Sequence, residues 1–454
     1  MYMYSCTGTL HKDNPLACKD NPLAGVYRYT RRCPPRERVG APMRSAAPTW
    51  MFTVGVGVGL GALLATRRLF LRYRRAKALA RCISLDDFQS AAREHLDLPL
   101  YEYLASGTAD EQTLFENVAA WKRYFLRPRM MRNVSCVSTA TTLFGQKMEM
   151  PIFISPAGVH RLCDPEGECA SARAADAVGS LFGLSQHATC SIEEVAAAAP
   201  GARRWFQAYI LQDRSLTLKL VRRAEVAGYS GLFLTVDSVV FGAREADVRN
   251  GFGGLPAHLR LANYDTDDGW KNEAEGGAWD QKTETLLAKA VTWEDVAWLK
   301  QAAPNLPLVV KGILTAEDAT CALDAGADGV CVSNHGGRQL DGALASIDAL
   351  EEVVRAVRAH SRGASACVLL DSGVRRGTDV LKALALGATA VGIGKPCFFA
   401  LAIGGRAGVE RALGILKTEL EAAMALCGCA SVADISRTLV EHRPHHAEYT
   451  RRPL

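Results

Sequence analysis

Short apolar runs recur along the chain from residue 151 onward, and segments with a helical period separate most of them. Each run is continuous rather than alternating, as expected for a strand that is buried on both faces. The expected strands are 151–155, 181–185, 205–210, 231–236, 308–311, 329–333, 367–371 and 390–394. Examples of the expected helices are 167–178, 216–227, 316–325 and 377–386. This alternation predicts a parallel sheet covered by helices.

The number of units decides between two ways of building such a sheet. Eight strand-helix units over about 250 residues match the size of a closed (β/α)8 barrel. A doubly wound open sheet is the alternative, but no GxGxxG phosphate loop follows the first strand. We therefore predict an α/β fold, a (β/α)8 TIM barrel, over residues 83–437.

Helices are expected before the barrel, and one connection within the barrel is unusually long. Residues 83–104 have a helical period, and Ser84 followed by Asp86 and Asp87 is typical of a helix N-terminus. The barrel therefore has an N-terminal helical extension. Between the fourth and fifth strands lies the stretch 251–277, which is rich in Gly, Asp and Asn. We interpret this stretch as a mobile lid over the barrel mouth, with a disordered insertion as the alternative.

The two ends of the chain differ from the barrel in composition. Residues 1–48 contain the sequence KDNPLA twice and several prolines, without a helical or strand period. This composition predicts a disordered tail, or a true start at Met43 in place of Met1. Residues 438–454 are expected to form a C-terminal tail.

A hydrophobic segment precedes the helical extension. Residues 50–65 are apolar and uncharged, and a cluster of arginines follows them. The apolar stretch is shorter than the ~20 residues that span a bilayer. A short anchor, an organelle-targeting segment and a signal-like region therefore all stay open for residues 49–78. We favour membrane association through residues 50–75, because arginines suit anionic headgroups.

Charge and cysteine content exclude two classes of function. The net charge of +5 is concentrated in the basic cluster near residues 67–81, so the barrel is not expected to bind nucleic acid. The 14 cysteines are scattered, with no CxxC pair and no zinc-type spacing. We therefore expect reduced thiols and no metal site.

Chemically reactive side chains gather where the strands end, which is where barrels of this kind carry their active sites. His335 and Arg338 follow the sixth strand. Imidazole can take a proton near neutral pH, and a guanidinium can hold a carboxylate. Glycines with Arg375 and Lys395 follow the last two strands and suit a phosphate, while Lys311 can place a cation against an electron-accepting ring. Together these residues outline a flavin mononucleotide (FMN) site with an organic-acid substrate.

Five segments resemble a known family. They are SNHGGRQLD (333–341), LVVKGILTAEDA (308–319), SGVRRGTDVLKALALGA (372–388), LTVDSVVFGAREADVRN (234–250) and PEGECASARAA (165–175). They resemble the FMN-dependent α-hydroxy-acid oxidases and dehydrogenases, the family of glycolate and lactate oxidases. The resemblance extends from about residue 83 to residue 437 and implies a (β/α)8 barrel with tightly bound FMN. It also implies oxidation of an L-2-hydroxy acid to the 2-oxo acid, in a tetramer or octamer.

The resemblance implies roles for individual residues. His335 would take a proton from the substrate, and Asp237 would stabilise the charged imidazole. Lys311 would stabilise the charge of the reduced flavin. The residues implied at the substrate, besides His335, are Arg338, Arg244, Tyr103, Tyr209, Gly158 and His187. Those implied at FMN are Pro156, Ala157, Gly158, Ser185, Gln207, Thr235, Lys311, Ser333, Asp371, Ser372, Gly373, Arg375, Gly394 and Lys395.

Three departures from the family pattern matter. Lys395 stands where an arginine is usual, which keeps the charge but loses the bidentate fork. Ser372 replaces a glycine and should be tolerated only if its backbone is not in a conformation that requires glycine. Gly158 and His187 replace an alanine and a tryptophan of the glycolate oxidases, which should open the substrate pocket. A medium-chain, long-chain or aromatic 2-hydroxy acid is therefore expected rather than glycolate.

The expected function is that of an FMN-dependent (S)-2-hydroxy-acid oxidase that uses O2 and releases H2O2. The alternative is a membrane-associated dehydrogenase of the lactate or mandelate type that passes electrons to a quinone or cytochrome. A catalytically silent barrel that serves as a membrane scaffold is a remote alternative. The C-terminal sequence Arg452-Pro453-Leu454 is not an SKL-like signal, so the location, membrane-associated or in a peroxisome or mitochondrion, stays open.

Overall fold

The computed structural model of this chain describes residues 75–264 and 283–444. The predictions for the tail at 1–48, for most of the segment 49–78 and for the later part of 251–277 fall outside the described residues. Across the ranges that are described, no helix is both long and apolar enough to cross a membrane.

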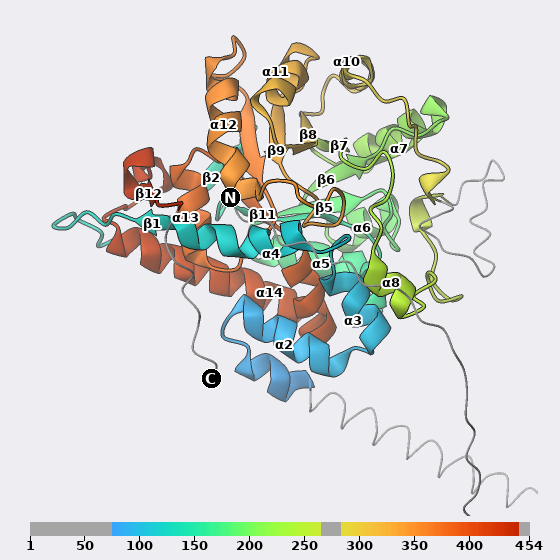
Figure 1. Cartoon of the computed structure of the whole chain (residues 1–454), viewed down its shortest axis with the longest axis horizontal. Coiled ribbons are helices and arrows are strands. Elements are labelled where there is room, and N and C mark those ends of the chain that lie inside the picture. The colour runs from blue at the N-terminus through green and yellow to red at the C-terminus, as the bar shows by residue number, and fades with distance from the viewer. Residues whose placement is uncertain (1–74, 265–282, 445–454) are drawn as a thin grey trace, which may run out of the picture. The chain divides into compact units, whose positions relative to one another are not determined.

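A helical extension precedes the barrel, as predicted. Its helices are α2 (Leu85–His95), α3 (Leu98–Ala105) and α4 (Gln112–Ala119). Ser84 caps α2, because its hydroxyl accepts a hydrogen bond from the backbone N–H of Asp87 at 3.3 Å. Phe88 is fully buried and holds α2 against the rest of the fold. Figure 1 shows α2 and α3 beside the long helix α14 (Lys395–Leu426).

Eight parallel strands close into a barrel, which confirms the predicted fold (Figure 1). The strands are β4 (Ile152–Ala157), β5 (Leu181–Ser185), β6 (Arg203–Ala208), β7 (Leu232–Thr235), β8 (Leu308–Ile313), β9 (Gly329–Val332), β10 (Cys367–Leu370) and β11 (Ala390–Ile393). Each strand pairs with the next along the chain, and β11 returns to β4. Such closure leaves no exposed sheet edge.

Helices surround the barrel. They are α5 (Gly167–Ala177), α6 (Ile192–Ala198), α7 (Arg214–Val226), α10 (Trp293–Ala302), α11 (Ala316–Asp324), α12 (Ser346–Ala359), α13 (Gly377–Ala385) and α14. The helix α14 is interrupted at Gly405, where φ is +55°. A short helix, α8 (Glu245–Arg249), lies in the long connection between β7 and β8.

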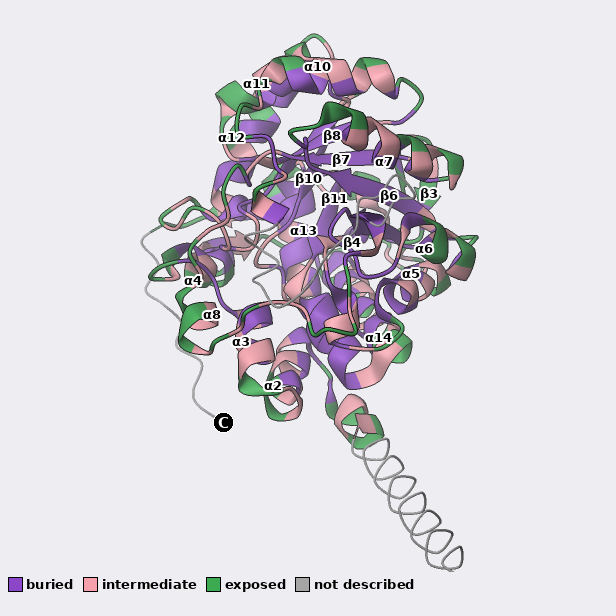
Figure 2. Ribbon diagram, turned by 90° about the vertical axis from the view of Figure 1, so that its right-hand side faces the viewer, coloured by how far each residue is buried: buried purple, intermediate pink, exposed green. Residues whose placement is uncertain are grey.

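The hydrophobic core has two layers, which appear purple in Figure 2. One layer lies between the strands and the helices. The other fills the barrel near the N-terminal ends of the strands and includes Phe153, Trp205 and Phe233. Leu143 and Met148 of the hairpin formed by β2 (Thr141–Leu143) and β3 (Gln146–Met148) join this inner layer. The N-terminal end of the barrel is therefore packed, and its opposite end carries the cavity described below.

The ordered fold extends beyond residue 437, where we had placed the end of the domain. Strand β12 (Val440–His442) pairs antiparallel with β1 (Tyr124–Leu126). The rings of Tyr124 and His442 stack, with their centroids 4.5 Å apart. Sequence alone did not indicate this contact, because a strand of three residues has no measurable period.

Candidate active site

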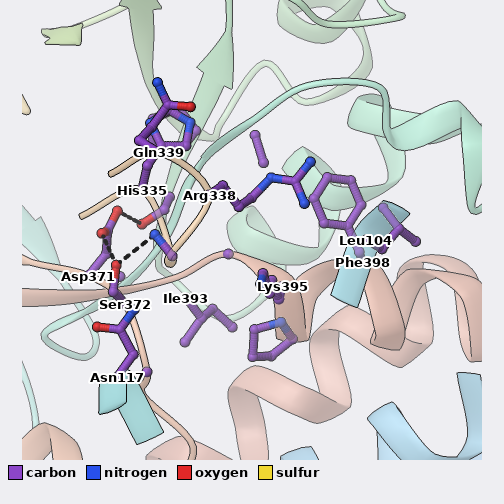
Figure 3. A pocket seen from close by; sticks show the side chains of 18 of the residues that line it. Leu104, Asn117, His335, Arg338, Gln339, Asp371, Ser372, Ile393, Lys395 and Phe398 are labelled. Carbon is purple, nitrogen blue, oxygen red and sulfur yellow. Dashed lines mark hydrogen bonds between the residues drawn. The ribbon is translucent and has the colours of Figure 1, made fainter. Parts of the chain in front are cut away.

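The C-terminal ends of the barrel strands surround a cavity (Figure 3). The empty space amounts to about 1240 Å³ when the solvent at its open mouth is included. The predicted site residues that line it are Tyr103, Pro156, Ala157, Gly158, Ser185, His187, Tyr209, Arg244, Lys311, His335, Arg338, Asp371, Ser372, Gly373, Arg375, Gly394 and Lys395. Four predicted residues lie behind this layer. Each is hydrogen-bonded to a lining residue or lies beside one on the neighbouring strand; they are Gln207, Thr235, Asp237 and Ser333.

An imidazole and a carboxylate form a close pair at one side of the cavity. His335 Nδ1 lies 2.8 Å from Asp237 Oδ1. Burial favours the neutral acid, but His335 and then Lys311 outweigh it, so the pKa of Asp237 is lowered. Asp237 is therefore a carboxylate near neutral pH. The Ser238 hydroxyl donates to the same oxygen of Asp237 at 3.1 Å and helps to orient it.

The turn that carries His335 explains the sequence HGGR. Residues His335, Gly336 and Gly337 all have positive φ, at +57°, +68° and +72°. A Cβ atom on Gly337 would lie 2.7 Å from the backbone N of Leu114 in α4, so no side chain fits there. The left-handed turn directs His335 and then Arg338 toward the cavity.

A buried lysine joins three strands behind the cavity. Lys311 Nζ donates to Ser333 Oγ at 3.0 Å and lies 3.6 Å from Asp371 Oδ2. The Ser155 hydroxyl donates to the same Asp371 oxygen at 3.0 Å. Burial alone would lower the pKa of Lys311, but the carboxylates of Asp371 and Asp237 outweigh burial and raise it. Lys311 therefore keeps a positive charge at the floor of the site.

Two arginines flank one tyrosine at another side of the cavity. The guanidinium carbons of Arg338 and Arg244 lie 5.1 and 5.5 Å from the centroid of the Tyr103 ring. Arg338 Nη1 donates to the carbonyl of Tyr103 at 2.6 Å, and Arg244 pairs with Asp247 at 2.8 Å. Burial, together with the charge of Arg244, lowers the pKa of Arg338 to about 10. The guanidinium still carries its charge at neutral pH, and this side of the cavity favours an anion.

Aromatic rings form the opposite wall. The His187 ring stacks on Tyr209 with centroids 4.9 Å apart and meets Phe241 edge-on at 6.3 Å. Burial, and then the charge of His335, lower the pKa of His187 to about 3, so this imidazole is neutral. Burial also raises the pKa of Tyr209 to about 12, which keeps its hydroxyl protonated.

The expectation that Gly158 opens this wall is wrong. A Cβ atom at residue 158 would lie 2.6 Å from the carbonyl oxygen of His187. The backbone of His187 thus occupies the space that a methyl group would need. Gly158 accommodates the position of the loop after β5 and does not widen the pocket.

Ser372 adopts the backbone conformation that we expected to exclude it. Its φ is +81°, in the left-handed region that favours glycine. Its hydroxyl accepts a hydrogen bond from the backbone N–H of Gly336 and donates one to Asp371 Oδ1, both at 3.1 Å (Figure 3). Ser372 therefore joins the turn that bears His335 to the carboxylate that pairs with Lys311.

The glycine-rich end of the cavity carries further positive charge. Arg375 lines it, and the helix α14 begins after Gly394 without a side-chain cap. A Cβ atom on Gly394 would meet no atom within 4 Å, so the backbone there borders open space. Lys395 Nζ donates to the carbonyls of Ala105 and Ser106, at 2.9 and 2.8 Å, so its ammonium group also holds the end of α3. Burial, followed by repulsion from Arg338 and Arg375, lowers the pKa of Lys395 well below its usual value.

These features fit FMN. The buried Gln207 Nε2 has no hydrogen-bond partner within the described part of the chain, and Lys311 supplies a cation at the same strand ends. A flavin ring with polar edges would satisfy both groups. The helix N-terminus at Gly394 and the guanidinium of Arg375 suit its phosphate. The cavity has more positively charged side chains than one phosphate requires, so it can also bind a second anion, the substrate carboxylate.

Several site residues were missed by the sequence reasoning. Gln339 Nε2 donates to the carbonyls of Asp237 and Val240, both at 2.9 Å, and so connects the turn bearing His335 to the loop after β7. Ser238 and Phe241 belong to the segment that we had quoted for the family resemblance. Their position in the sequence could have identified them, because both follow the end of a predicted strand by only a few residues, where barrels carry their active sites.

Comparisons with known proteins agree with this geometry. The family model described as FMN-dependent dehydrogenase matches residues 92–442. Glycolate oxidase 3 of Oryza sativa subsp. indica is 45% identical over 358 residues, which cover 79% of this chain and 95% of that protein. 2-Hydroxyacid oxidase 1 of Homo sapiens is 45% identical over 370 residues, which cover 81% of this chain and 98% of that protein. A solved structure of mandelate oxidase with benzoyl-formic acid is 42% identical, with a TM-score of 0.71 over 79% of this chain and 98% of that one.

Proposed function

Since the chain belongs to the FMN-dependent dehydrogenase family, we propose that it oxidises an L-2-hydroxy acid larger than glycolate and passes the electrons to O2, producing H2O2. Oxidation of a 2-hydroxy acid with FMN follows from the family and from the relatives named glycolate oxidase and 2-hydroxyacid oxidase. The stereochemistry, the substrate size, the acceptor and the role of each residue are our proposals. The observation that carries the proposed chemistry is the 2.8 Å pair of His335 and Asp237 on a cavity that also holds two arginines.

His335 acts as the general base. Its Nδ1 is bonded to Asp237, so Nε2 is the nitrogen that takes the proton from the substrate. The Asp237 carboxylate stabilises the imidazolium that forms, and His335, Lys311 and Ser238 together favour the ionised form of this carboxylate. FMN, when bound, would supply the acceptor for the two electrons that the hydroxy acid loses.

Arg338 and Arg244 hold the substrate carboxylate. Both guanidinium groups lie over Tyr103, which keeps them side by side and turned toward the cavity. Burial raises the pKa of Tyr103 as well as that of Tyr209, so both phenols are protonated and can donate to substrate oxygens. A planar carboxylate and a fork of N–H donors match in geometry.

The protein holds FMN through two groups of residues. Those proposed at the ring and ribityl chain are Pro156, Ala157, Ser185, Gln207, Thr235, Lys311, Ser333 and Asp371. Those proposed at the phosphate end are Ser372, Gly373, Arg375, Gly394 and Lys395. Lys311 places a fixed positive charge in the floor of the cavity, where it would favour negative charge on a bound flavin ring.

The substrate wall supports an apolar substituent on the hydroxy acid. His187 is neutral and stacked on Tyr209, so the wall presents aromatic faces without a second charge. The imidazole of His187 is also smaller than the tryptophan of the glycolate oxidases. Because Gly158 does not widen the pocket, this difference in size is what supports a substrate larger than glycolate. Solved relatives of this fold include mandelate oxidase bound to aromatic acids.

Anaerobic mixing of the purified holoenzyme with L- and D-2-hydroxy acids tests the chemistry. We expect the L-acid to bleach the flavin absorbance and the D-acid to leave it unchanged. His335→Gln, a variant of similar size without a basic nitrogen, should abolish bleaching while the flavin stays bound. Rapid bleaching in that variant would overturn the role of His335.

Mixing the reduced enzyme with air tests the acceptor. Reoxidation by O2 as fast as turnover supports an oxidase, whereas slow reoxidation by O2 with fast reoxidation by a quinone or cytochrome supports the dehydrogenase. A peroxisomal (S)-2-hydroxy-acid oxidase of Oryza sativa subsp. japonica, 45% identical over 363 residues, supports an oxidase in an organelle. Membrane association through residues 50–75 and assembly as a tetramer or octamer stay predictions.

A further inference from the structure

A buried glutamine connects two tyrosines behind the substrate wall. Gln186 is fully buried and directly precedes His187 in the chain. Its Oε1 accepts a hydrogen bond from the backbone N–H of Tyr209 at 2.9 Å, and its Nε2 donates to the hydroxyl of Tyr264 at 2.7 Å. A backbone N–H can only donate, so the oxygen of the amide must face Tyr209 and its nitrogen must face Tyr264. The side chain of Gln186 therefore fits between its two partners in one orientation.

The rings of the same two tyrosines both contact His187. The His187 ring stacks on Tyr209 with centroids 4.9 Å apart, and its centroid lies 5.7 Å from that of Tyr264 with the rings tilted by 31°. Tyr264 is buried and belongs to the short helical turn η3 (Ala262–Tyr264), in the connection between β7 and β8. Hydrogen bonds through Gln186 and ring contacts through His187 thus join the same pair of tyrosines.

The turn η3 also holds the backbone of the loop that carries His187. Asn263 is fully buried, and its Nδ2 donates to the carbonyl of Gln186 at 3.2 Å. Its Oδ1 accepts a hydrogen bond from the backbone N–H of Ile192 at 2.9 Å, at the start of α6. Asn263 therefore fixes both ends of this loop through backbone groups. A substitution of the Gln186 side chain leaves those bonds in place and acts on the rings alone.

We propose that Gln186 and Tyr264 are positioning residues that determine which hydroxy acids the site accepts, because they hold the His187 ring against Tyr209. The inference rests on the proposed function, in which the substituent of the hydroxy acid packs against this wall. Gln186 and Tyr264 act through His187 and Tyr209, which line the cavity. Loss of either partner leaves a buried polar group unpaired, and the wall must shift to satisfy it. An acid with a bulky substituent responds to that shift, whereas glycolate has no substituent to contact the wall.

Anaerobic bleaching of the flavin in the full-length holoenzyme tests the inference without depending on the electron acceptor. The two acids compared are glycolate and the larger L-2-hydroxy acid that the wild type oxidises fastest. Tyr264→Phe removes one hydroxyl and should raise the half-saturating concentration of the larger acid about tenfold, because the buried Gln186 amide loses a partner. The limiting rate of bleaching, and both values for glycolate, should stay close to those of the wild type. A change confined to one acid separates positioning of the wall from a general loss of structure.

A double variant tests whether the two residues act through one contact. Gln186→Leu removes both hydrogen bonds of the amide and leaves the backbone N–H of Tyr209 unpaired. It should therefore slow bleaching by both acids and raise the half-saturating concentration of the larger acid more than Tyr264→Phe does. Adding Tyr264→Phe to Gln186→Leu should change little further, since the hydroxyl has already lost its Gln186 partner. Effects that multiply in the double variant would contradict the proposal.

Tyr229→Phe is the matched control. Tyr229 is also buried, and its hydroxyl donates to the carbonyl of Ile192 at 3.1 Å. This variant should lower Tm about as much as Tyr264→Phe does and leave the ratio of the two acids unchanged. A wild type that prefers glycolate would count against the proposed substrate size, yet Tyr264→Phe should still shift the ratio. An unchanged ratio in both Tyr264→Phe and Gln186→Leu would overturn the inference and leave the proposed function intact.

Discussion

Ser372 allows a prediction whose size follows from its backbone and two hydrogen bonds. Its φ of +81° places a non-glycine residue in the left-handed region, which costs roughly 1–2 kcal/mol. Each of its two 3.1 Å hydrogen bonds contributes about 1 kcal/mol. Ser372→Ala keeps the backbone strain and loses both bonds, so it should destabilise the protein by about 2 kcal/mol. Ser372→Gly loses the same bonds but removes the backbone strain. Glycine also makes the unfolded chain more flexible, which costs about 0.5–1 kcal/mol of stability, so this variant should be destabilised by about 1 kcal/mol in all.

Thermal unfolding of the holoenzymes measures this order. At roughly 2 °C per kcal/mol for a large domain, we expect Tm to fall by about 4 °C for Ser372→Ala and about 2 °C for Ser372→Gly. Ser90, which lies inside α2 and is exposed, is the matched control. There the order should reverse, because glycine costs about 1 kcal/mol more than alanine within a helix. An alanine variant at residue 372 as stable as the wild type, or more stable than the glycine variant, would refute the reasoning.

Three further predictions follow from the site. Asp237→Asn should lower kcat about 10²–10⁴-fold. The pKa of Asp237 is lower in the folded than in the unfolded state, so the ionised carboxylate stabilises the fold above pH 3.8, the ordinary pKa, and this stabilisation is lost as the pH falls through the folded-state pKa. The melting temperatures of wild type and variant should therefore converge on acidification. His187→Trp should raise the ratio of kcat/KM for glycolate over a larger acid about 10–200-fold in a substrate competition assay, and no change would remove His187 from the specificity argument. Lys395→Met should weaken FMN binding about tenfold, measured by fluorescence of released flavin, because it removes a hydrogen-bond donor from an anion site and from the end of α3.

Local patterns were sufficient to predict the barrel, because each strand is a continuous apolar run and Ser84 marks the start of α2. The cavity was predictable as well, since strand ends in a closed barrel converge whatever the loop conformation. The pair of His335 and Asp237 followed from the family resemblance and not from spacing, because the two residues are 98 positions apart in the chain.

The positions of backbone atoms in the loops could not be predicted from the sequence. The effect of Gly158 depends on where the carbonyl of His187 lies, and no pattern in residues 185–190 indicates that. The hydrogen bonds of Lys395 with the end of α3 likewise join segments 289 and 290 residues apart. The positive φ of Ser372 depends on how the loop after β10 is folded, which the residue types in that loop do not determine.

The measurement that tests the central claim most directly is kcat/KM with O2 for glycolate, L-lactate, longer straight-chain L-2-hydroxy acids and L-mandelate, assayed on one preparation of holoenzyme. We expect kcat/KM to rise from glycolate to a medium-chain, long-chain or aromatic L-acid, because a neutral His187 stacked on Tyr209 forms the substrate wall. The highest kcat/KM with glycolate would contradict it.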